Sequence, residues 1–133
     1  MKFHEDGSRP ADKAIFVFGS NLNGHHGGGA AYAAYRHFGA EVGVGVGPTG
    51  QSYAIPTLNR EMDRMALADI RKHVADFITY ARSNPNKRFF VTRVGCGIAG
   101  FEDRQIAPMF SGAPGNCSFA EDWREFLRPN DFS

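Results

Sequence analysis

The chain has 133 residues, a formal net charge of +1, 42% hydrophobic residues and 22% charged residues. That length suits one globular domain with its own core, and the composition excludes an intrinsically disordered chain. The near-neutral charge excludes the basic footprint of a duplex-DNA binder, no apolar run reaches membrane-spanning length, and two cysteines, Cys96 and Cys117, exclude a disulfide framework.

The N-terminal residues 1–13 are polar and contain Gly7 and Pro10, which predicts a loose lead-in to a single domain at 14–133. They include no apolar signal segment, so we expect a cytoplasmic protein without membrane contacts. A short continuous apolar run at 14–19 then predicts a strand that is buried on both faces.

A polar, glycine-rich loop at 20–29 separates this strand from an alanine-rich helix predicted at 30–38. Valine then alternates with glycine at 41–47, which we interpret as a strand with little side-chain bulk on one face. A turn leads into a second short strand at 52–55, and Pro56 is expected to end it.

The clearest amphipathic helix is predicted at 67–81, where apolar residues recur at helical spacing. A strand at 88–94 follows, then a glycine-rich loop at 95–100 and short helices at 103–110 and 120–127. Because strands alternate with helices over short connections, the pattern predicts an α/β fold. We expect a three-layer α/β/α sandwich with a mixed, largely parallel sheet.

Two glycine-rich loops, at 27–29 and 95–100, each follow a predicted strand. Ligands of α/β sheets bind at the carboxyl ends of the strands, where glycine leaves backbone N–H groups open to an anion. Either loop alone is explained as a turn of the chain. Two such loops at equivalent strand ends predict a shared diphosphate site that needs no basic side chain.

The residues around these loops resemble macrodomains, the ADP-ribose-binding superfamily. Phe18-Gly19-Ser20-Asn21 and Gly27-Gly28-Gly29-Ala30-Ala31 are similar to the strand end and first loop of that fold. The run from Arg93 to Phe101 looks like its second phosphate loop, and Gly-Cys-Gly after an arginine is most similar to the ADP-ribosyl glycohydrolase branch. The resemblance runs in order over roughly residues 14–110 and implies a macrodomain-like fold.

The resemblance implies binding of ADP-ribose or a related NAD-derived nucleotide, either free or attached to a protein or nucleic acid. Asn21 would meet the distal ribose, Phe101 would pack beside it, and Cys96 would line the phosphate loop without acting as a nucleophile. The implied ligand-binding residues are Gly19, Ser20, Asn21, Gly27, Gly28, Gly29, Ala30, Gly95, Cys96, Gly97, Ile98, Ala99, Gly100 and Phe101. Neither a metal ion nor a cofactor is predicted.

Hydrolysis is the open question. The lysine and aspartate on which the glycohydrolase branch relies correspond here to Leu58 and Ala99. Cleavage of a ribosyl bond needs a general acid or base, and the candidates near the loops are His25, His26 and Asp103. The same residues have plainer roles as solvated loop histidines and a helix cap.

Three alternatives therefore stand. The first is a binding module, with or without weak ADP-ribosyl hydrolase activity. The second is a competent ADP-ribosyl glycohydrolase that acts on modified protein or nucleic acid. The third is a protein-interaction module that keeps the fold without a ligand.

Overall fold

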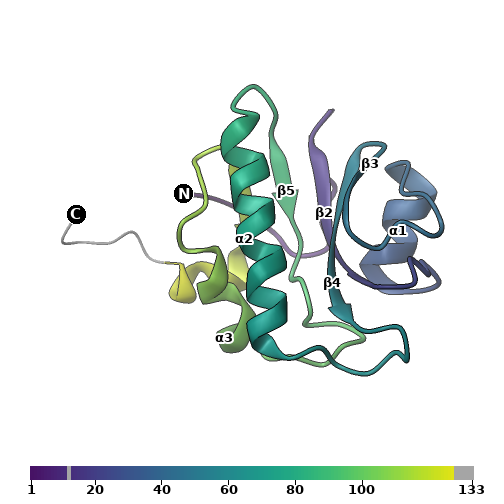
Figure 1. Cartoon of the computed structure of the whole chain (residues 1–133). Coiled ribbons are helices and arrows are strands. Elements are labelled where there is room, and N and C mark those ends of the chain that lie inside the picture. The colour runs from purple at the N-terminus through teal and green to yellow at the C-terminus, as the bar shows by residue number, and fades with distance from the viewer. Residues whose placement is uncertain (12, 128–133) are drawn as a thin grey trace.

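The computed structural model describes residues 1–11 and 13–127, which fold around one mixed sheet (Figure 1). Within them the sheet has six strands in the order β1-β6-β5-β2-β4-β3. β3 runs antiparallel to β4, and every other neighbouring pair is parallel, which confirms the predicted sheet. The strands are β1 (Lys2–His4), β2 (Ile15–Asn21), β3 (Gly47–Thr49), β4 (Ser52–Leu58), β5 (Phe89–Val91) and β6 (Cys117–Ala120).

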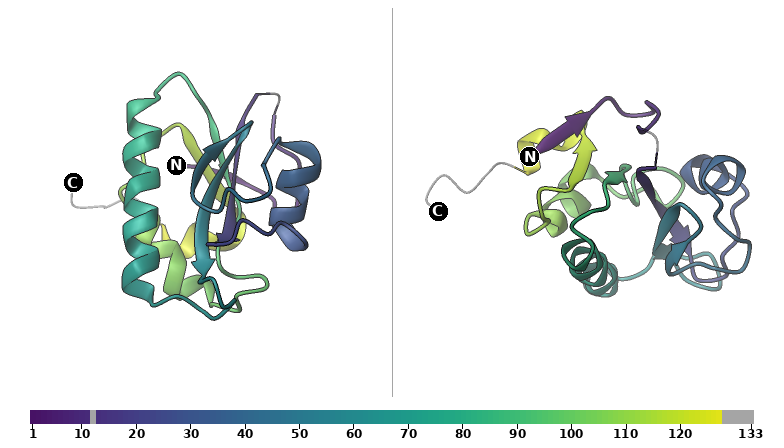
Figure 2. Two further views of the ribbon diagram at one scale, coloured as in Figure 1. Left: turned by 45° about the vertical axis from the view of Figure 1, so that its right-hand side comes forward. Right: turned by 90° about the horizontal axis from the view of Figure 1, so that it is seen from above.

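Helices cover both faces of this sheet, so the domain has three layers (Figure 2). The helix α1 lies on one face, and α2, α3 and η1 lie on the other. Side chains alternate along a strand: Val17 of β2 joins the core beneath α2, whereas Phe16 and Phe18 join the core beneath α1. The helices are α1 (Gly29–His37), α2 (Leu67–Ser83) and α3 (Asp103–Ile106), with the 3-10 helices η1 (Ala107–Phe110) and η2 (Glu121–Phe126).

The core beneath α2 is the larger of the two. The apolar stripe predicted for this helix is fully buried at Ile70, Val74, Phe77 and Ala81, so the expected amphipathic helix is confirmed. On the opposite face, α1 offers small residues such as Ala34, which let the helix backbone lie close to the sheet. The sequence pattern thus predicted both packing faces.

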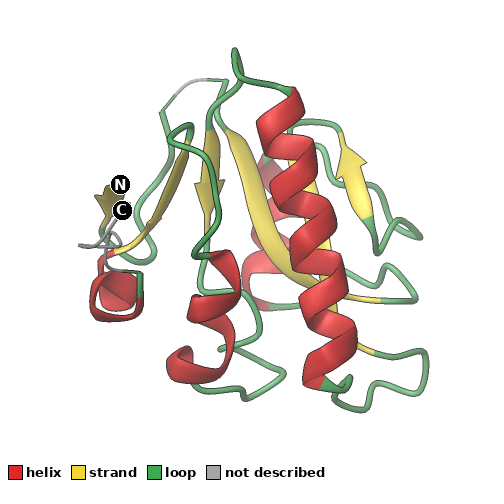
Figure 3. Cartoon of the chain, turned by 60° about the vertical axis from the view of Figure 1, so that its left-hand side comes forward, coloured by secondary structure: helices red, strands yellow, loops and turns green. Residues whose placement is uncertain are grey.

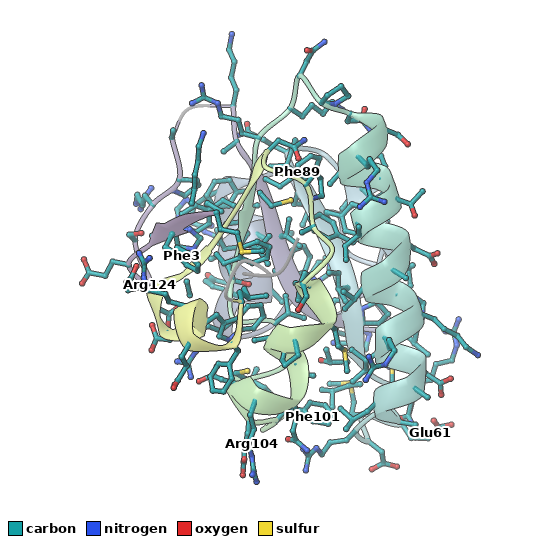
Figure 4. The ribbon with its side chains drawn as sticks, turned by 90° about the vertical axis from the view of Figure 1, so that its left-hand side faces the viewer. Phe3, Glu61, Phe89, Phe101, Arg104 and Arg124 are labelled. Carbon is teal, nitrogen blue, oxygen red and sulfur yellow. The ribbon has the colours of Figure 1, made fainter. Side chains whose placement is uncertain are left out.

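The N-terminal segment is a correction to the predicted lead-in, because β1 is a strand of the sheet (Figure 3). β1 pairs with β6, and the ring of His4 stacks on Phe90 with centroids 3.7 Å apart. The guanidinium of Arg124 lies over the ring of Phe3 at 4.2 Å (Figure 4). Three residues are too few for a pattern of period two, so the sequence carried no readable strand signal here. Of the predicted domain, residues 128–133 lie outside the described residues.

The valine–glycine segment at 41–47 is a second correction, because only its last residue enters a strand. Val42 and Val46 are exposed, and the segment turns back over the end of β2. A Cβ atom on Gly45 would lie 2.0 Å from the carbonyl oxygen of Asn21, and the hydroxyl of Ser20 donates to the Gly45 carbonyl. Glycine therefore serves close backbone contact here, not strand alternation.

The strand after it runs further than predicted. β4 continues through Pro56 to Leu58, with all seven residues buried. Pro56 lies beyond Ala54, the last residue of β4 that pairs with β3, and a proline is tolerated where one side of a strand has no partner. β5 is shorter than the predicted strand at 88–94, because the chain turns after Val91: the N–H of Val94 donates to the carbonyl of Thr92 at 2.8 Å.

Candidate ligand site at the carboxyl edge of the sheet

The two glycine-rich loops line one cavity of about 810 Å³. They approach each other closely, because a Cβ atom on Gly28 would lie 3.2 Å from Cδ1 of Ile98. The cavity includes these residues of the predicted site: Gly19, Ser20, Asn21, His25, Gly27, Gly28, Gly29, Ala30, Gly95, Cys96, Gly97, Ile98 and Ala99. The predicted residues Gly100, Phe101, His26 and Asp103 are not part of its lining.

The first loop ends at the N-terminus of α1, which opens onto the cavity. Gly28 is the extended N-cap residue, and no side chain caps the helix. The N–H of Tyr32 bonds to the carbonyl of Gly28 at 3.2 Å, so the N–H groups before it have no intrahelical acceptor. Gly29 and Ala30 carry such groups and line the cavity, and no acidic side chain occupies the first turn. This end of the cavity therefore offers hydrogen-bond donors and the positive end of a helix dipole.

The second loop is a tight turn closed by backbone hydrogen bonds. The N–H of Phe101 donates to the carbonyl of Gly95 at 2.8 Å, and Gly95 and Gly100 have φ of +79° and +75°. Phe101, labelled in Figure 4, packs below the loop in the core. The guanidinium of Arg64 lies over its ring at 4.0 Å. The implied role of Phe101 beside a ribose is therefore corrected, because its ring supports the loop from inside.

Asp103 is held by an ion pair beneath the second loop. Its carboxylate accepts two hydrogen bonds from Arg93, at 2.9 and 2.7 Å, and one from the indole N–H of Trp123 at 2.7 Å. Partial burial opposes ionisation, but these hydrogen bonds outweigh it and hold the pKa of Asp103 below its usual value. A carboxylate so engaged is not a general acid, so the candidate role of Asp103 is corrected to that of an anchor.

The adjacent histidines have different surroundings. His26 is only 5% exposed, its ring lies edge-on to Phe18, and its Nε2 lies 2.9 Å from the carbonyl oxygen of Glu41. It supports the loop from below, which corrects its candidate catalytic role. His25 is exposed and lines the cavity, so it is the one of the three acid–base candidates that faces the site.

Asn21 lines the cavity, but its amide shapes the first loop. Its Oδ1 accepts from the N–H of His25 at 3.1 Å, and its Nδ2 donates to the carbonyl of His25 at 2.9 Å. This is the plain turn-forming use of an asparagine. Its side chain therefore holds His25 in place at the cavity.

The thiol of Cys96 lines the cavity in its protonated form. Burial, followed by its nearness to Asp103, raises the pKa of Cys96 to about 12. The thiol lies 3.6 Å from the carbonyl oxygen of Val94. Because the thiolate is the reactive species, the protonated thiol of Cys96 is not a nucleophile at neutral pH.

Part of the cavity is built from residues that sequence reasoning missed. The N-terminal segment at 6–10 forms one wall, because the pairing of β1 with β6 carries it across the sheet. An aromatic floor comes from Phe16, Phe38 and Phe90. The placement of Phe16 and Phe90 on one face follows from strand alternation, but nothing in the sequence connects the segment at 6–10 to the loops.

Other classes of site are not seen in the described part of the chain. No group of three or more His, Cys, Asp or Glu side chains there is placed to hold a metal ion. Among the same residues, no helix combines the length and apolar character needed to cross a bilayer.

Comparison with known proteins places the chain by its fold alone. No protein-family model matches it, and no curated protein is detectably similar in sequence. A solved structure of a protein of unknown function from Bacteroides thetaiotaomicron is similar with a TM-score of 0.60 and 12% identity, over 90% of this chain and 96% of that one. A crystal structure of a protein from the same organism is similar with a TM-score of 0.59 and 12% identity, over 90% of this chain and 99% of that one. The α/β sandwich is thus a fold that occurs in solved proteins of matching length.

Proposed function

We propose that the cavity binds ADP-ribose or a related NAD-derived nucleotide, with the diphosphate held between the two glycine-rich loops. The observation that supports this most is that both loops line one cavity, at the edge of the sheet where β2 ends and the chain leaves β5. Its volume of about 810 Å³ lies within the usual range for small-molecule sites.

The chemistry of the lining suits such a ligand. The uncapped N-terminus of α1 supplies donors for an anion without requiring a lysine or arginine. The aromatic floor at Phe16, Phe38 and Phe90 offers apolar contact for a nucleobase, chiefly at the half-buried Phe38, whose ring stacks on that of Phe16. The ligand would therefore span the cavity, with its base over the floor and its diphosphate at the loops.

Two residues of the cavity lining favour binding over cleavage. Leu58 and Ala99 both line the cavity, and these are the positions where the resemblance places the lysine and aspartate of glycohydrolases. Both residues are apolar and neither is an acid or a base. The chain would then act as a binding module, and an ADP-ribosylated protein or nucleic acid is the partner class that this ligand implies.

A second candidate function is hydrolysis that depends on His25. The observation in its favour is that His25 is exposed and lines the cavity, where its imidazole can reach a bound ligand. Incubation with ADP-ribosylated protein or DNA would then release ADP-ribose, and His25→Ala would abolish release while binding persists. Binding without release supports the module alone.

Calorimetric titration with ADP-ribose tests the proposed function. We expect saturable one-site binding, and a rise of several degrees in Tm, because ligand at one hundred times Kd adds about 2.7 kcal/mol to stability. AMP and ribose 5-phosphate, which each carry half of the ligand, should bind more weakly. Neither heat nor a Tm shift at millimolar ADP-ribose would reject the proposal and leave the ligand-free interaction module.

A further inference from the structure

We propose that Arg93 is a positioning residue that fastens the N-terminal wall, residues 6–10, against the ligand cavity, so that ligand binding and the order of this wall are coupled. The identity of the ligand rests on the proposed function. The fastening of the wall does not, because it is a property of the free protein.

The wall reaches the cavity from a distant part of the sheet. β1 is an edge strand, and β6 and β5 separate it from β2, which carries the first loop. From β1 the chain turns, with the N–H and hydroxyl of Ser8 both donating to the carbonyl of Glu5. Residues 6–10 then line the cavity.

One side-chain contact joins this wall to the rest of the domain. Nη1 of Arg93 donates to Oδ2 of Asp6 at 3.4 Å. The hydroxyl of Ser8 bonds only back to Glu5. Among the described residues, the Arg93–Asp6 contact is therefore the one side-chain hydrogen bond that joins residues 6–10 to a residue later in the chain. The residues of the wall are exposed or half-buried and lie between β1 and β2, so we infer that this contact sets how the wall lies against the cavity.

Arg93 is suited to this task because its other donors are fixed. Nε and Nη2 bind both oxygens of Asp103, which Trp123 also holds. A planar guanidinium with two anchored nitrogens presents the third in a set direction. Arg93 also precedes the second loop, so one side chain orients the loop and the wall together.

Asp122 provides a matched control. It lies 3.9 Å from the same Nη1 and its side chain is 46% exposed, against 3.4 Å and 43% for Asp6. Asp122 belongs to η2 and does not line the cavity. Asp6→Asn and Asp122→Asn therefore each remove one exposed ion pair from Arg93, but only the first releases the wall.

The direction in which Asp6→Asn changes ligand affinity distinguishes a positioning role of Asp6 from an effect of its charge alone. Asp6 lines a cavity proposed to hold a diphosphate, so loss of its negative charge would by itself tighten binding. If Asp6 fastens the wall, the same substitution weakens binding. The released residues 6–10 must then be ordered when the ligand binds, and this ordering reduces the free energy of binding.

The experiment measures ADP-ribose affinity by calorimetry and amide hydrogen exchange of residues 1–11 in wild type, Asp6→Asn and Asp122→Asn. We expect Asp6→Asn to raise Kd about two- to fivefold, the range of one exposed ion pair, and Asp122→Asn to leave it unchanged. In the free protein, Asp6→Asn should speed exchange at Ser8, whose N–H is the one amide among residues 6–9 with a backbone acceptor, and Asp122→Asn should not. ADP-ribose should slow exchange there in the wild type.

A further ligand, the hypoxanthine analogue IDP-ribose, tests for direct contact between Asp6 and the base. Its base lacks the amino group of adenine, so a loss seen only with ADP-ribose would mean that Asp6 touches the base, and the positioning role would be wrong. Equal Kd values and exchange rates for the two variants, or tighter binding by Asp6→Asn, would also overturn it. If the wild type binds neither ligand, the proposed function fails, and exchange in the free variants still decides whether Arg93 holds the wall.

Discussion

Gly28 and Ile98 face each other across the cavity, so closely that a methyl group on Gly28 would lie 3.2 Å from Cδ1 of Ile98. The two residues come from different loops, which follow different strands. Ile98 is 73% exposed, an unusual position for a large aliphatic side chain. Because both residues line the cavity, added bulk at this approach of the two loops should hinder a ligand.

Valine at Gly28 or Gly97 should therefore abolish ADP-ribose binding without unfolding the protein. Neither residue has a positive φ, and a Cβ on Gly97 meets no atom within 4 Å, so the backbone tolerates a side chain. Calorimetry and urea denaturation measure the two effects separately. Gly115→Val is the control, because Gly115 is equally open and lies outside the cavity. Unchanged affinity in both loop variants would mean that the ligand binds elsewhere.

Gly45→Ala should destabilise the fold, in contrast to these loop variants. The added Cβ would lie 2.0 Å from the carbonyl oxygen of Asn21, and backbone cannot yield as a side-chain tip does. We expect a loss of more than about 2 kcal/mol in the free energy of unfolding, measured by urea denaturation. Gly115→Ala is the matched control and should change stability by less than about 0.5 kcal/mol. A stable Gly45→Ala protein would show that the 41–47 segment does not pack as described.

Asp103→Asn should cost stability at neutral pH and little in acid. The hydrogen bonds from Arg93 and Trp123 make the pKa of Asp103 lower in the folded state than in the unfolded state, where it is about 3.9. The ionised Asp103 therefore contributes fully to the free energy of unfolding at pH values above its unfolded-state pKa. This contribution disappears as the pH falls through its lower folded-state pKa. We expect a loss of about 1–2 kcal/mol at pH 7, given that the pair is partly solvent-exposed.

Urea denaturation of wild type and Asp103→Asn between pH 7 and pH 2 measures this convergence. Asp122→Asn, which removes a long and exposed contact with the same arginine, should be nearly neutral throughout. A stability difference for Asp103→Asn that does not shrink below pH 4 would contradict the role of its charge.

Alanine substitutions at the two adjacent histidines should have different effects on stability. His26→Ala removes the hydrogen bond to Glu41 and the packing against Phe18, and we expect a loss of about 2 kcal/mol. His25→Ala removes an exposed ring and should leave the Tm unchanged within error. Differential scanning calorimetry checks both, and equal destabilisation by the two substitutions would contradict the assignment of His26 alone to loop support.

Local patterns in the sequence were sufficient for much of the fold. The apolar run of β2 and the helical stripe of α2 each depend on residues close together in the chain, and the structure confirms both. The glycines at 41–47 show where such reasoning fails. Their spacing imitates strand alternation, but Gly45 is needed for a contact with Asn21 that no local pattern reports.

The sequence by itself determined the alternation of strands and helices and the two glycine-rich loops, because periodicity and glycine content act within a few residues. Only the tertiary structure decided that these loops line one cavity, that His25 faces it while His26 does not, and that residues 6–10 close one side. The reason is that strand order is set by long-range pairing. β1 joins the sheet beside β6, near the opposite end of the chain, and no neighbouring residue encodes that partnership.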